Sequence, residues 1–399
     1  MSDLFQIPIY GASEDSTNPF ERFDLRDNPF PAAGVDSGVL YQRHMEKEIA
    51  QINRWIQEVG NATALDKGSP GPVHPLAIYG SIGVGKTHLL RYLQRGLSQN
   101  EFTPVLRKGL ADEGMTRLVL ANLFLRYLPF QETDDEPGTG LIKKIIEAAK
   151  QNHKQDEILN TLRDGSPIAI PFKILLKKDI ENDAVIWMSR WLRREYTTPA
   201  QRAKLGIAGV LQSEGEAVRA VADLLRLSRA AKVLQVWFVM IDQLEELWRP
   251  GVITSSRRAR FLTDLRHLVD QALEGAPIAL LLAWNTTVTE SAFASDVSHQ
   301  MKRDYRALWQ RLGNTVNLPP LSETDVWPFA KKYLEKAGVN DAAAERRKDL
   351  FHKLKAATED VISQIQGETA RGVKAPLTPR SVLQAWRDKA LEIATEARQ

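Results

Sequence analysis

The sequence of 399 residues contains no cysteine. Disulfide bonds and thiolate metal sites are therefore excluded, and the composition is typical of a reducing compartment. No apolar run approaches the roughly 18 residues that a membrane span requires. The first residues have neither the basic start nor the apolar core of a signal peptide. We therefore expect a cytoplasmic protein that has no membrane partner.

An excess of charge of one sign is also lacking, since 53 Lys and Arg residues are balanced by 50 Asp and Glu residues. The net charge of +3 is too small to identify a nucleic-acid partner by itself. Hydrophobic residues (43%) and charged residues (26%) have the proportions of an ordinary globular protein. The length allows two or three domains. Function therefore has to be inferred from motifs.

The most informative segment is the octapeptide GSIGVGKT at residues 80–87, which follows an apolar run and precedes a helix-compatible stretch. It matches the phosphate-binding pattern G-x-x-x-x-G-K-[ST] in the strand-then-helix context that this pattern requires. Glycines let the backbone wrap around an anion, and the helix N-terminus directs N–H groups at the phosphates. We expect Lys86 to reach the β- and γ-phosphates and Thr87 to ligate Mg²⁺. The cofactors predicted are ATP and Mg²⁺.

The residues of this segment that are expected to contact the nucleotide are Gly80, Ser81, Ile82, Gly83, Val84, Gly85, Lys86, Thr87 and His88.

A second motif begins with the apolar run VLQVWFVMI at residues 233–241, which is typical of a strand buried on both faces of a parallel sheet. It ends at Asp242, where a carboxylate at the carboxyl edge of the sheet can hold Mg²⁺ directly or through water. The alternative for Asp242 is a capping role in the next turn. Glu245 and Glu246 follow, and either could orient the water that attacks the γ-phosphate. The sequence does not distinguish between these two acids.

A third motif is the apolar run at residues 277–284, which ends at Asn285. If this strand lies beside the strand of Asp242, the amide of Asn285 can hydrogen-bond the γ-phosphate or the attacking water. A simple turn role is the alternative.

The order of these patterns predicts an α/β fold with a parallel-sheet P-loop core, a helical insertion and a C-terminal all-helical lid domain. Residues 1–38 are expected to form an extended arm, in which Asn18-Pro19-Phe20 is repeated at Asn28-Pro29-Phe30. This arm packs on its own chain or, as the less favoured alternative, on a neighbouring subunit. The core is expected over 39–321 and the lid over 322–399.

The insertion is expected at about 129–231, because roughly a hundred residues separate the second predicted strand from the run at 233–241. Helices are predicted at 115–128, 141–162, 184–194 and 215–231, with an apolar, proline-interrupted piece at 166–176.

Taken together, these elements resemble the AAA+ ATPases, with the nearest likeness to the origin-recognition initiators and transposition regulators. The resemblance spans roughly 39–110 and 232–390. It implies ATP hydrolysis, self-assembly and a sensor 1 role for Asn285. It also implies that Arg43, in the segment QRHMEKEI before the P-loop, lines the adenine pocket.

The same resemblance assigns roles to arginines near the end of the core and in the lid. Arg311, in WQRLG before the closing strand, resembles the arginine finger that contacts the nucleotide of a neighbouring subunit, with Arg306 as a rival. Arg380, which follows Pro379 at a late helix start, resembles the sensor 2 arginine that contacts the γ-phosphate.

Two departures from the family pattern bear on function. Gln243 stands where the family has an acid directly after the Walker B aspartate, which predicts slow hydrolysis, and the sequence DQLEE resembles the spaced acids of STAND signalling NTPases. The insertion has no counterpart in a minimal AAA+ core. Its segments WMSRWL (187–192) and KLGI (204–207) resemble ATPases of bacterial phage-defence and mobile-element operons.

The leading hypothesis is therefore an ATP-dependent switch that hydrolyses ATP slowly, forms a homo-oligomer and acts on DNA in such a context. Basic residues could contact DNA phosphates from two segments: Arg257, Arg258, Arg260, Lys302, Arg303 and Arg306.

The alternative is a STAND-like signalling or scaffold NTPase that recognises a protein partner through the insertion. Trp187 and Trp191 would contribute to that interface unless they pack in the core, which is the more ordinary role. A small-molecule kinase is disfavoured by the helical tail.

Overall fold

The computed structural model describes residues 18–32, 41–67, 70–101, 103–110, 139–152, 154–177, 182–249, 251, 253–288, 295–367 and 374–396. The chain divides into a sheet unit, residues 45–82 and 86–319, and a helical unit, which holds the described residues up to 44, residues 83–85 and those from 320 onward. The helix expected at 115–128 lies outside the described residues. None of the helices in the described ranges has the length and apolar character to cross a membrane.

The core of the sheet unit is a five-stranded parallel sheet with the strand order β2-β3-β4-β1-β7. The two apolar runs predicted as buried strands form β3 and β4 in the interior of the sheet. Side chains on both faces of these strands are covered, which explains why the two runs are apolar. This parallel sheet confirms the predicted α/β fold class. The strands are β1 (Leu76–Gly80), β2 (Val105–Gly109), β3 (Trp237–Asp242), β4 (Ile278–Asn285) and β7 (Asn314–Asn317).

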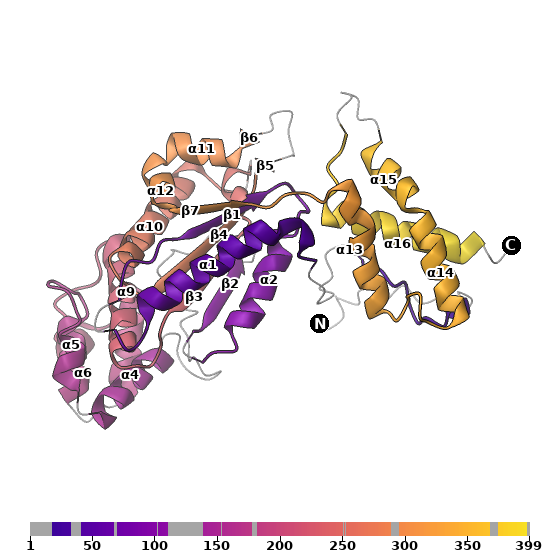
Figure 1. The fold of residues 1–399 in the computed structure, drawn as a ribbon. Helices are drawn as coiled ribbons and strands as arrows, with labels where there is room; N and C mark the ends of the chain where they lie inside the picture. The colour runs from indigo at the N-terminus through magenta and orange to yellow at the C-terminus, as the bar shows by residue number, and fades with distance from the viewer. Residues whose placement is uncertain are drawn as a thin grey trace, which may run out of the picture. The chain divides into compact units, whose positions relative to one another are not determined.

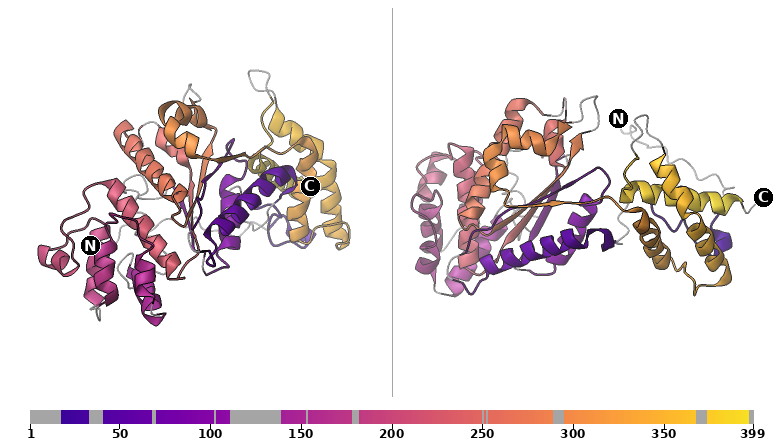
Figure 2. Two further views of the ribbon diagram at one scale, coloured as in Figure 1. Left: turned by 60° about the vertical axis from the view of Figure 1, so that its left-hand side comes forward. Right: turned by 45° about the horizontal axis from the view of Figure 1, so that its top comes forward.

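Helices cover both faces of this sheet. α1 (Glu46–Thr63) and α2 (Lys86–Leu97) lie on one face, and α10 (Ser255–Leu273) and α12 (Arg306–Arg311) on the other (Figures 1 and 2). The remaining elements are the helices η2 (Arg43–Met45), η3 (Leu244–Trp248) and α11 (Val297–Asp304), and an antiparallel pair, β5 (Thr287–Val288) with β6 (Ser295–Asp296).

The regular elements in the described part of the region between β2 and β3 are helices. The single helix expected at 141–162 is wrong, because the chain forms α4 and α5 with a break between them. The piece at 166–176 is largely the helix α6, which tolerates Pro171 because the N–H groups of a first turn need no helical partner. These helices are α4 (Thr139–Gln151), α5 (Gln155–Leu159), α6 (Ala169–Lys177), α7 (Asn182–Leu192), α8 (Pro199–Lys204) and α9 (Glu214–Ala230).

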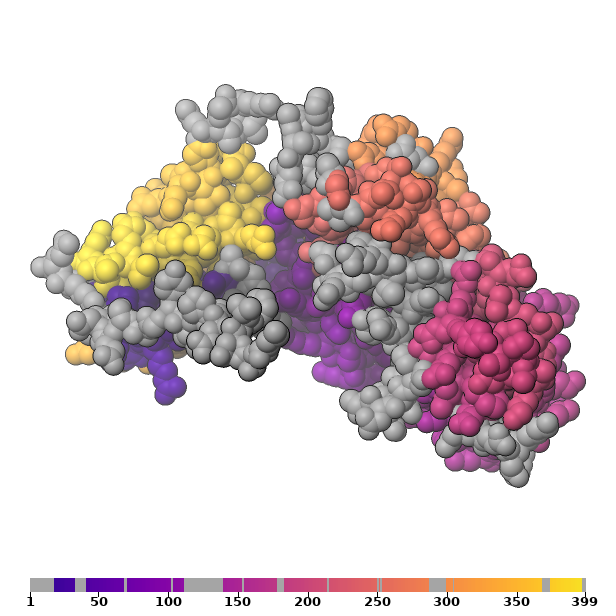
Figure 3. All heavy atoms as spheres, turned by 180° about the vertical axis from the view of Figure 1, so that it is seen from behind, coloured from indigo at the N-terminus to yellow at the C-terminus, as the bar shows by residue number. Residues whose placement is uncertain are grey.

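Most of these helices gather in one lobe of the sheet unit, coloured magenta to pink in Figure 3. Trp191 is buried in the core and Trp187 is half-buried against it, so the ordinary packing role holds for Trp191.

The helical unit contains α13 (Glu323–Lys336), α14 (Glu345–Ala356), α15 (Thr358–Gln366) and α16 (Pro379–Glu396). The arm packs into its core through Phe20 and Phe30, which are buried there with the short helix η1 (Glu21–Phe23) between them. Each repeat builds the same turn, since the side-chain oxygens of Asn18 and Asn28 each accept the N–H two residues on at 3.0 Å. For its described part, packing of the arm within its own chain is confirmed.

Candidate nucleotide site

The P-loop has the backbone conformation that its glycines permit. Gly83 and Gly85 have φ angles of 86° and 98°, in the left-handed region that side chains disfavour. The loop leaves β1 at Gly80 and enters α2 at Lys86, so it leads to a helix N-terminus. Such an N-terminus with unpaired N–H groups is suited to an anion.

Lys86 is buried at the start of α2, with 7% of its surface exposed. Its ammonium group donates to the carbonyl oxygens of Gly80 (3.0 Å) and Ser81 (2.8 Å). Burial lowers the pKa of Lys86 to about 8, and the nearby carboxylates of Glu245 and Asp242 oppose this shift. Burial takes the Lys86 ammonium out of water. A phosphate bound at the loop would supply a favourable electrostatic interaction in place of the lost hydration.

Thr87 and Asp242 place two oxygen ligands side by side. The Thr87 hydroxyl donates to Oδ2 of Asp242 at 2.6 Å, and Oδ1 accepts the N–H of Gln243 at 2.9 Å. The described residues contain no group of three or more His, Cys, Asp or Glu side chains placed to hold a metal ion. The pair fits Mg²⁺ all the same, because this ion is held by one or two protein oxygens together with phosphate oxygens and water.

The chain after Asp242 determines which acid faces the site. Gln243 has a φ of 61°, which costs a non-glycine residue about 1 kcal/mol, and η3 begins directly after it. This turn buries Glu245, of which 8% is exposed, whereas Glu246 is half-buried and pairs with Arg249 at 3.4 Å. The structure therefore places the carboxylate of Glu245 where the charge of Lys86 acts on it.

Asn285 holds Glu245 with two hydrogen bonds. Its backbone N–H donates to Oε2 of Glu245 at 3.0 Å, and its side-chain amide donates to Oε1. Burial raises the pKa of Glu245, whereas these hydrogen bonds and Lys86 oppose the rise. Asn285 is in register with Gly80, and β4 lies directly beside β3, so the predicted neighbourhood of the two strands is confirmed. A role of Asn285 toward the γ-phosphate remains a prediction.

The other predicted residues have different surroundings, and within the helical unit the N–H of Arg380 donates to the carbonyl of Gly83 in the P-loop at 3.3 Å. Arg311 forms an ion pair with Asp270 of α10, whereas Arg306 is exposed and its side chain has no hydrogen bond or ion pair to any residue in the described ranges. His88 is half-buried in the first turn of α2. Arg43, in η2, and Arg380, the second residue of α16, belong to the helical unit, and their contacts with the nucleotide remain predictions.

Sequence reasoning missed two residues that shape the site. Gln243 sets the turn that orients Glu245, and the N–H of Thr286 donates to the Gly80 carbonyl at 3.0 Å, which ties the end of β4 to the P-loop. Gln243 is visible in the sequence only as a departure from the family pattern. The role of Thr286 cannot be predicted from the sequence, because Thr286 contributes its backbone N–H and not its side chain.

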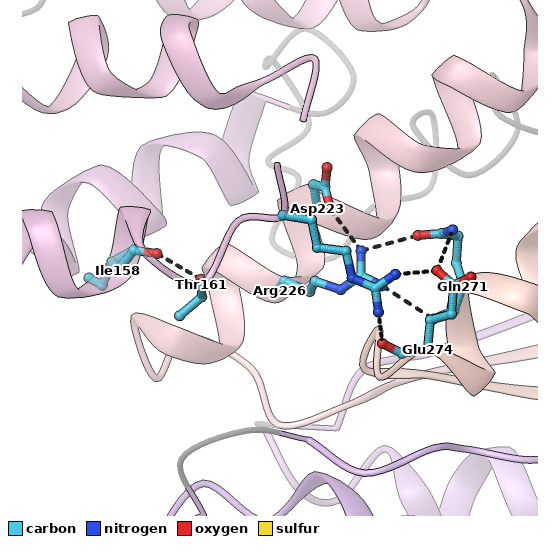
Figure 4. Close-up of polar contacts among 7 residues, drawn as sticks. Ile158, Thr161, Asp223, Arg226, Gln271 and Glu274 are labelled. Carbon is cyan, nitrogen blue, oxygen red and sulfur yellow. Dashed lines mark hydrogen bonds and ion pairs between the residues drawn. The ribbon is translucent and has the colours of Figure 1, made fainter. Parts of the chain in front are cut away.

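A second cluster of charges, of which Asp223 and Arg226 are buried, joins the insertion to α10 (Figure 4). Arg226 of α9 donates to Oδ1 of Asp223 at 2.7 Å and to Oε1 of Gln271 at 3.1 Å. Burial lowers the pKa of Arg226, and Asp223 opposes this. Arg163 pairs with Glu274 beside it. We refer to these five residues as the α9–α10 clamp.

The comparisons with known proteins bear on the fold. No known protein family and no curated protein matches the chain in sequence. The ORC2 protein of Aeropyrum pernix, solved as ADPNP–ADP complexes, is similar with a TM-score of 0.41 and 14% identity over 95% of this chain and 68% of that chain. A Walker-type ATPase of Pyrococcus abyssi is similar with a TM-score of 0.37 and 13% identity over 94% of this chain and 76% of that chain.

Proposed function

We propose that the chain is an AAA+-type switch that binds ATP, hydrolyses it slowly, self-assembles and acts on DNA. The observation that carries the proposal is the buried Lys86, whose hydrogen bonds within the described ranges go to carbonyl oxygens of the P-loop, at a sheet edge that also presents Thr87 and Asp242. Desolvation of an ammonium group without an ion-pair partner is costly unless a ligand supplies the opposite charge. The triphosphate of a nucleotide is that ligand.

For hydrolysis we assign the water-orienting role to Glu245. Phosphoryl transfer depends on positioning and charge stabilisation, and Glu245 is fixed by Asn285 beside Lys86. Mg²⁺, held by Thr87 and Asp242, would neutralise phosphate charge when bound. Because both oxygens of Glu245 are already engaged, and Gln243 adds no second acid, we expect slow turnover.

For self-assembly we propose Arg306 as the residue that contacts the nucleotide of a neighbouring copy. It is exposed on α12, whereas Arg311 on the same helix is held by Asp270. Arg43 and Arg380 are proposed to contact the adenine and the γ-phosphate. The basic residues of α10 and α11 are proposed to contact DNA phosphates, in a mobile-element or phage-defence setting.

The second candidate is a STAND-like scaffold that uses the insertion to bind a protein partner. The half-buried Trp187 favours it, because aromatic residues are enriched in interfaces.

The deciding experiment measures the mass of the full chain by light scattering, with and without a non-hydrolysable ATP analogue and DNA. Assembly that requires the analogue supports the switch. A monomer that binds the analogue but never assembles overturns self-assembly and supports the scaffold.

The matched control is Arg306→Ala against Arg311→Ala. Loss of ATPase activity on assembly in the first variant, with activity kept in the second, would support the assignment of Arg306. The reverse result would return the role to Arg311.

A further inference from the structure

Tyr196, between α7 and α8, is the most exposed large hydrophobic side chain in the described ranges, with 81% of its surface in contact with solvent. Burying a side chain of this size would stabilise the fold by roughly 1.5–3 kcal/mol. The exposure of Tyr196 therefore contributes nothing to folding and suggests contact with another molecule.

The backbone that carries Tyr196 is fixed on its N-terminal side by the end of α7. The N–H groups of Arg194 and Glu195 donate to the carbonyls of Trp191 and Arg190, both at 2.9 Å. Arg194 has a φ of 60°, in the position where helix ends prefer glycine. The left-handed backbone conformation of Arg194 costs about 1 kcal/mol relative to glycine at this position.

The backbone is also fixed on the C-terminal side. Thr197 is buried, and its carbonyl accepts a hydrogen bond from the guanidinium of Arg202. Thr198 and Gln201 form a reciprocal capping box at the start of α8. Tyr196 is thereby held out between two anchored segments.

The sequence on either side of Tyr196 is rich in positive charge. Residues 187–204 contain five cations and one acid, Glu195, which is paired with Arg193 at 2.8 Å. The cations are Arg190, Arg193, Arg194, Arg202 and Lys204.

Two further observations bring some of these cations together. Trp187 and Arg190 are spaced at i and i+3, so they share one side of α7, and the exposed Arg194 follows just beyond the end of this helix. The ammonium of Lys204 lies 5.1 Å from the ring centre of Trp187, which joins α8 to the same side. We call Trp187, Arg190, Arg194, Tyr196 and Lys204 the Tyr196 face.

We propose that the Tyr196 face binds a single strand of nucleic acid, with the phosphates on the cations and an unpaired base stacked on Tyr196. A positively charged surface with an exposed ring provides the two contacts that single strands use. A duplex hides the faces of its bases, and an acidic protein segment would satisfy the cations but not the ring. The proposal rests on the proposed action on DNA and names the surface and the form of the strand.

The Tyr196 face is connected through α9 to the strand that ends at the nucleotide site. α7 packs on α9, and α9 leads through a short connection into β3, which ends at Asp242. A bound strand would therefore lie one helix away from the Walker B strand.

The test measures the anisotropy of a labelled oligothymidine with the full chain at low salt. We expect Tyr196→Ala to weaken binding about tenfold, because one stacked base is lost, and Tyr196→Phe to bind within about twofold of the original. Equal binding by Tyr196→Ala and the unchanged chain would overturn the stacking contact.

A second variant separates binding from folding. Arg194→Gly removes one cation and relieves the left-handed backbone, so we expect its melting temperature to stay level or rise while affinity falls and the salt dependence decreases. The control is Arg54→Ala, which removes an exposed charge from α1 and should leave binding unchanged. An equal loss in both variants would show only a general charge effect and would overturn the assigned surface.

The failures of the two proposals are distinguishable. If the chain binds ATP and oligothymidine but neither Tyr196→Ala nor Arg194→Gly changes the affinity, the inference fails and action on DNA stands. If it binds ATP and no nucleic acid at low salt, action on DNA fails as well. Competition by polyglutamate as strong as by oligothymidine would identify a site for acidic protein and overturn the nucleic-acid assignment.

Discussion

Two of the places where the sheet unit buries charged side chains differ in the partners of those charges. At the nucleotide edge, Lys86 donates to neutral carbonyl oxygens of its own loop. In the α9–α10 clamp, Arg226 donates to the carboxylate of Asp223. A buried cation with neutral partners retains most of its attraction for an anion, whereas a buried ion pair is already neutralised. In the clamp the ion pair holds two helices together, whereas at the nucleotide edge we propose that an anion binds.

The largest expected effect comes from Lys86→Ala. Losing two charge-assisted hydrogen bonds to phosphate should weaken ATP binding by about a thousandfold or more. Because no buried ion pair is broken, thermal stability should stay level or rise. Calorimetric titration with ATP and thermal unfolding check the two halves, and a large loss of stability would contradict the view of Lys86 as a ligand-binding group.

Arg226→Ala should lower stability and leave ATP binding unchanged, which is the opposite of the result expected for Lys86→Ala. It leaves Asp223 buried without its partner, which should lower the free energy of unfolding by about 3 kcal/mol in urea titrations. The folded fraction should bind ATP with unchanged affinity. The double variant Asp223→Leu, Arg226→Leu is the control, since it removes both charges and should recover much of the loss.

Glu245→Gln tests the acid assigned at the nucleotide edge. We expect kcat for ATP hydrolysis to fall about a hundredfold, because general-base and positioning effects have this size, with ATP affinity within about threefold. Glu246→Gln is the matched control and should keep its activity, because Glu246 faces Arg249. If the two variants exchange these outcomes, the water-orienting acid is Glu246.

The smallest expected effect is a pH dependence of ATP binding. The pKa of Lys86 is lowered from 10.5 to about 8 in the folded chain. Bound phosphate favours the ammonium and raises this pKa, so binding above pH 8 takes up a proton. Affinity should therefore fall about fivefold from pH 8 to 9.

The same shift affects stability with a definite sign. A lowered lysine pKa means that the folded state prefers the neutral amine, so the stability contribution is present above pH 10.5 and is lost as pH falls through 8. Stability without nucleotide should thus increase from pH 8 to 10 through this group, and Lys86→Met should remove that increase. An affinity that is independent of pH between 8 and 9 would contradict the low pKa.

A feature of the structure could be predicted from the sequence when the residues that determine it are adjacent in the chain. The P-loop and the strands that end at Asp242 and Asn285 are carried by contiguous residues, so their elements and order were predicted. Which of Glu245 and Glu246 is buried beside Asn285 was not predicted, because this depends on the left-handed turn at Gln243. The α9–α10 clamp and the pairing of Arg311 with Asp270 join residues about forty or more positions apart. Such contacts are decided by how helices pack, which no local pattern reports.

The two Asn-Pro-Phe turns of the arm have a consequence for the order in which the chain folds during synthesis. Asn28 donates to the carbonyl of Arg387, 359 residues later, and Arg22 donates to that of Ile393, 371 residues later. The ribosome synthesises the whole sheet unit before it synthesises α13 to α16. Phe20 and Phe30 therefore cannot be buried by these helices until the end of synthesis. Since domains generally fold as they emerge, the helical unit is expected to close last, when the earliest and latest segments of the described chain meet.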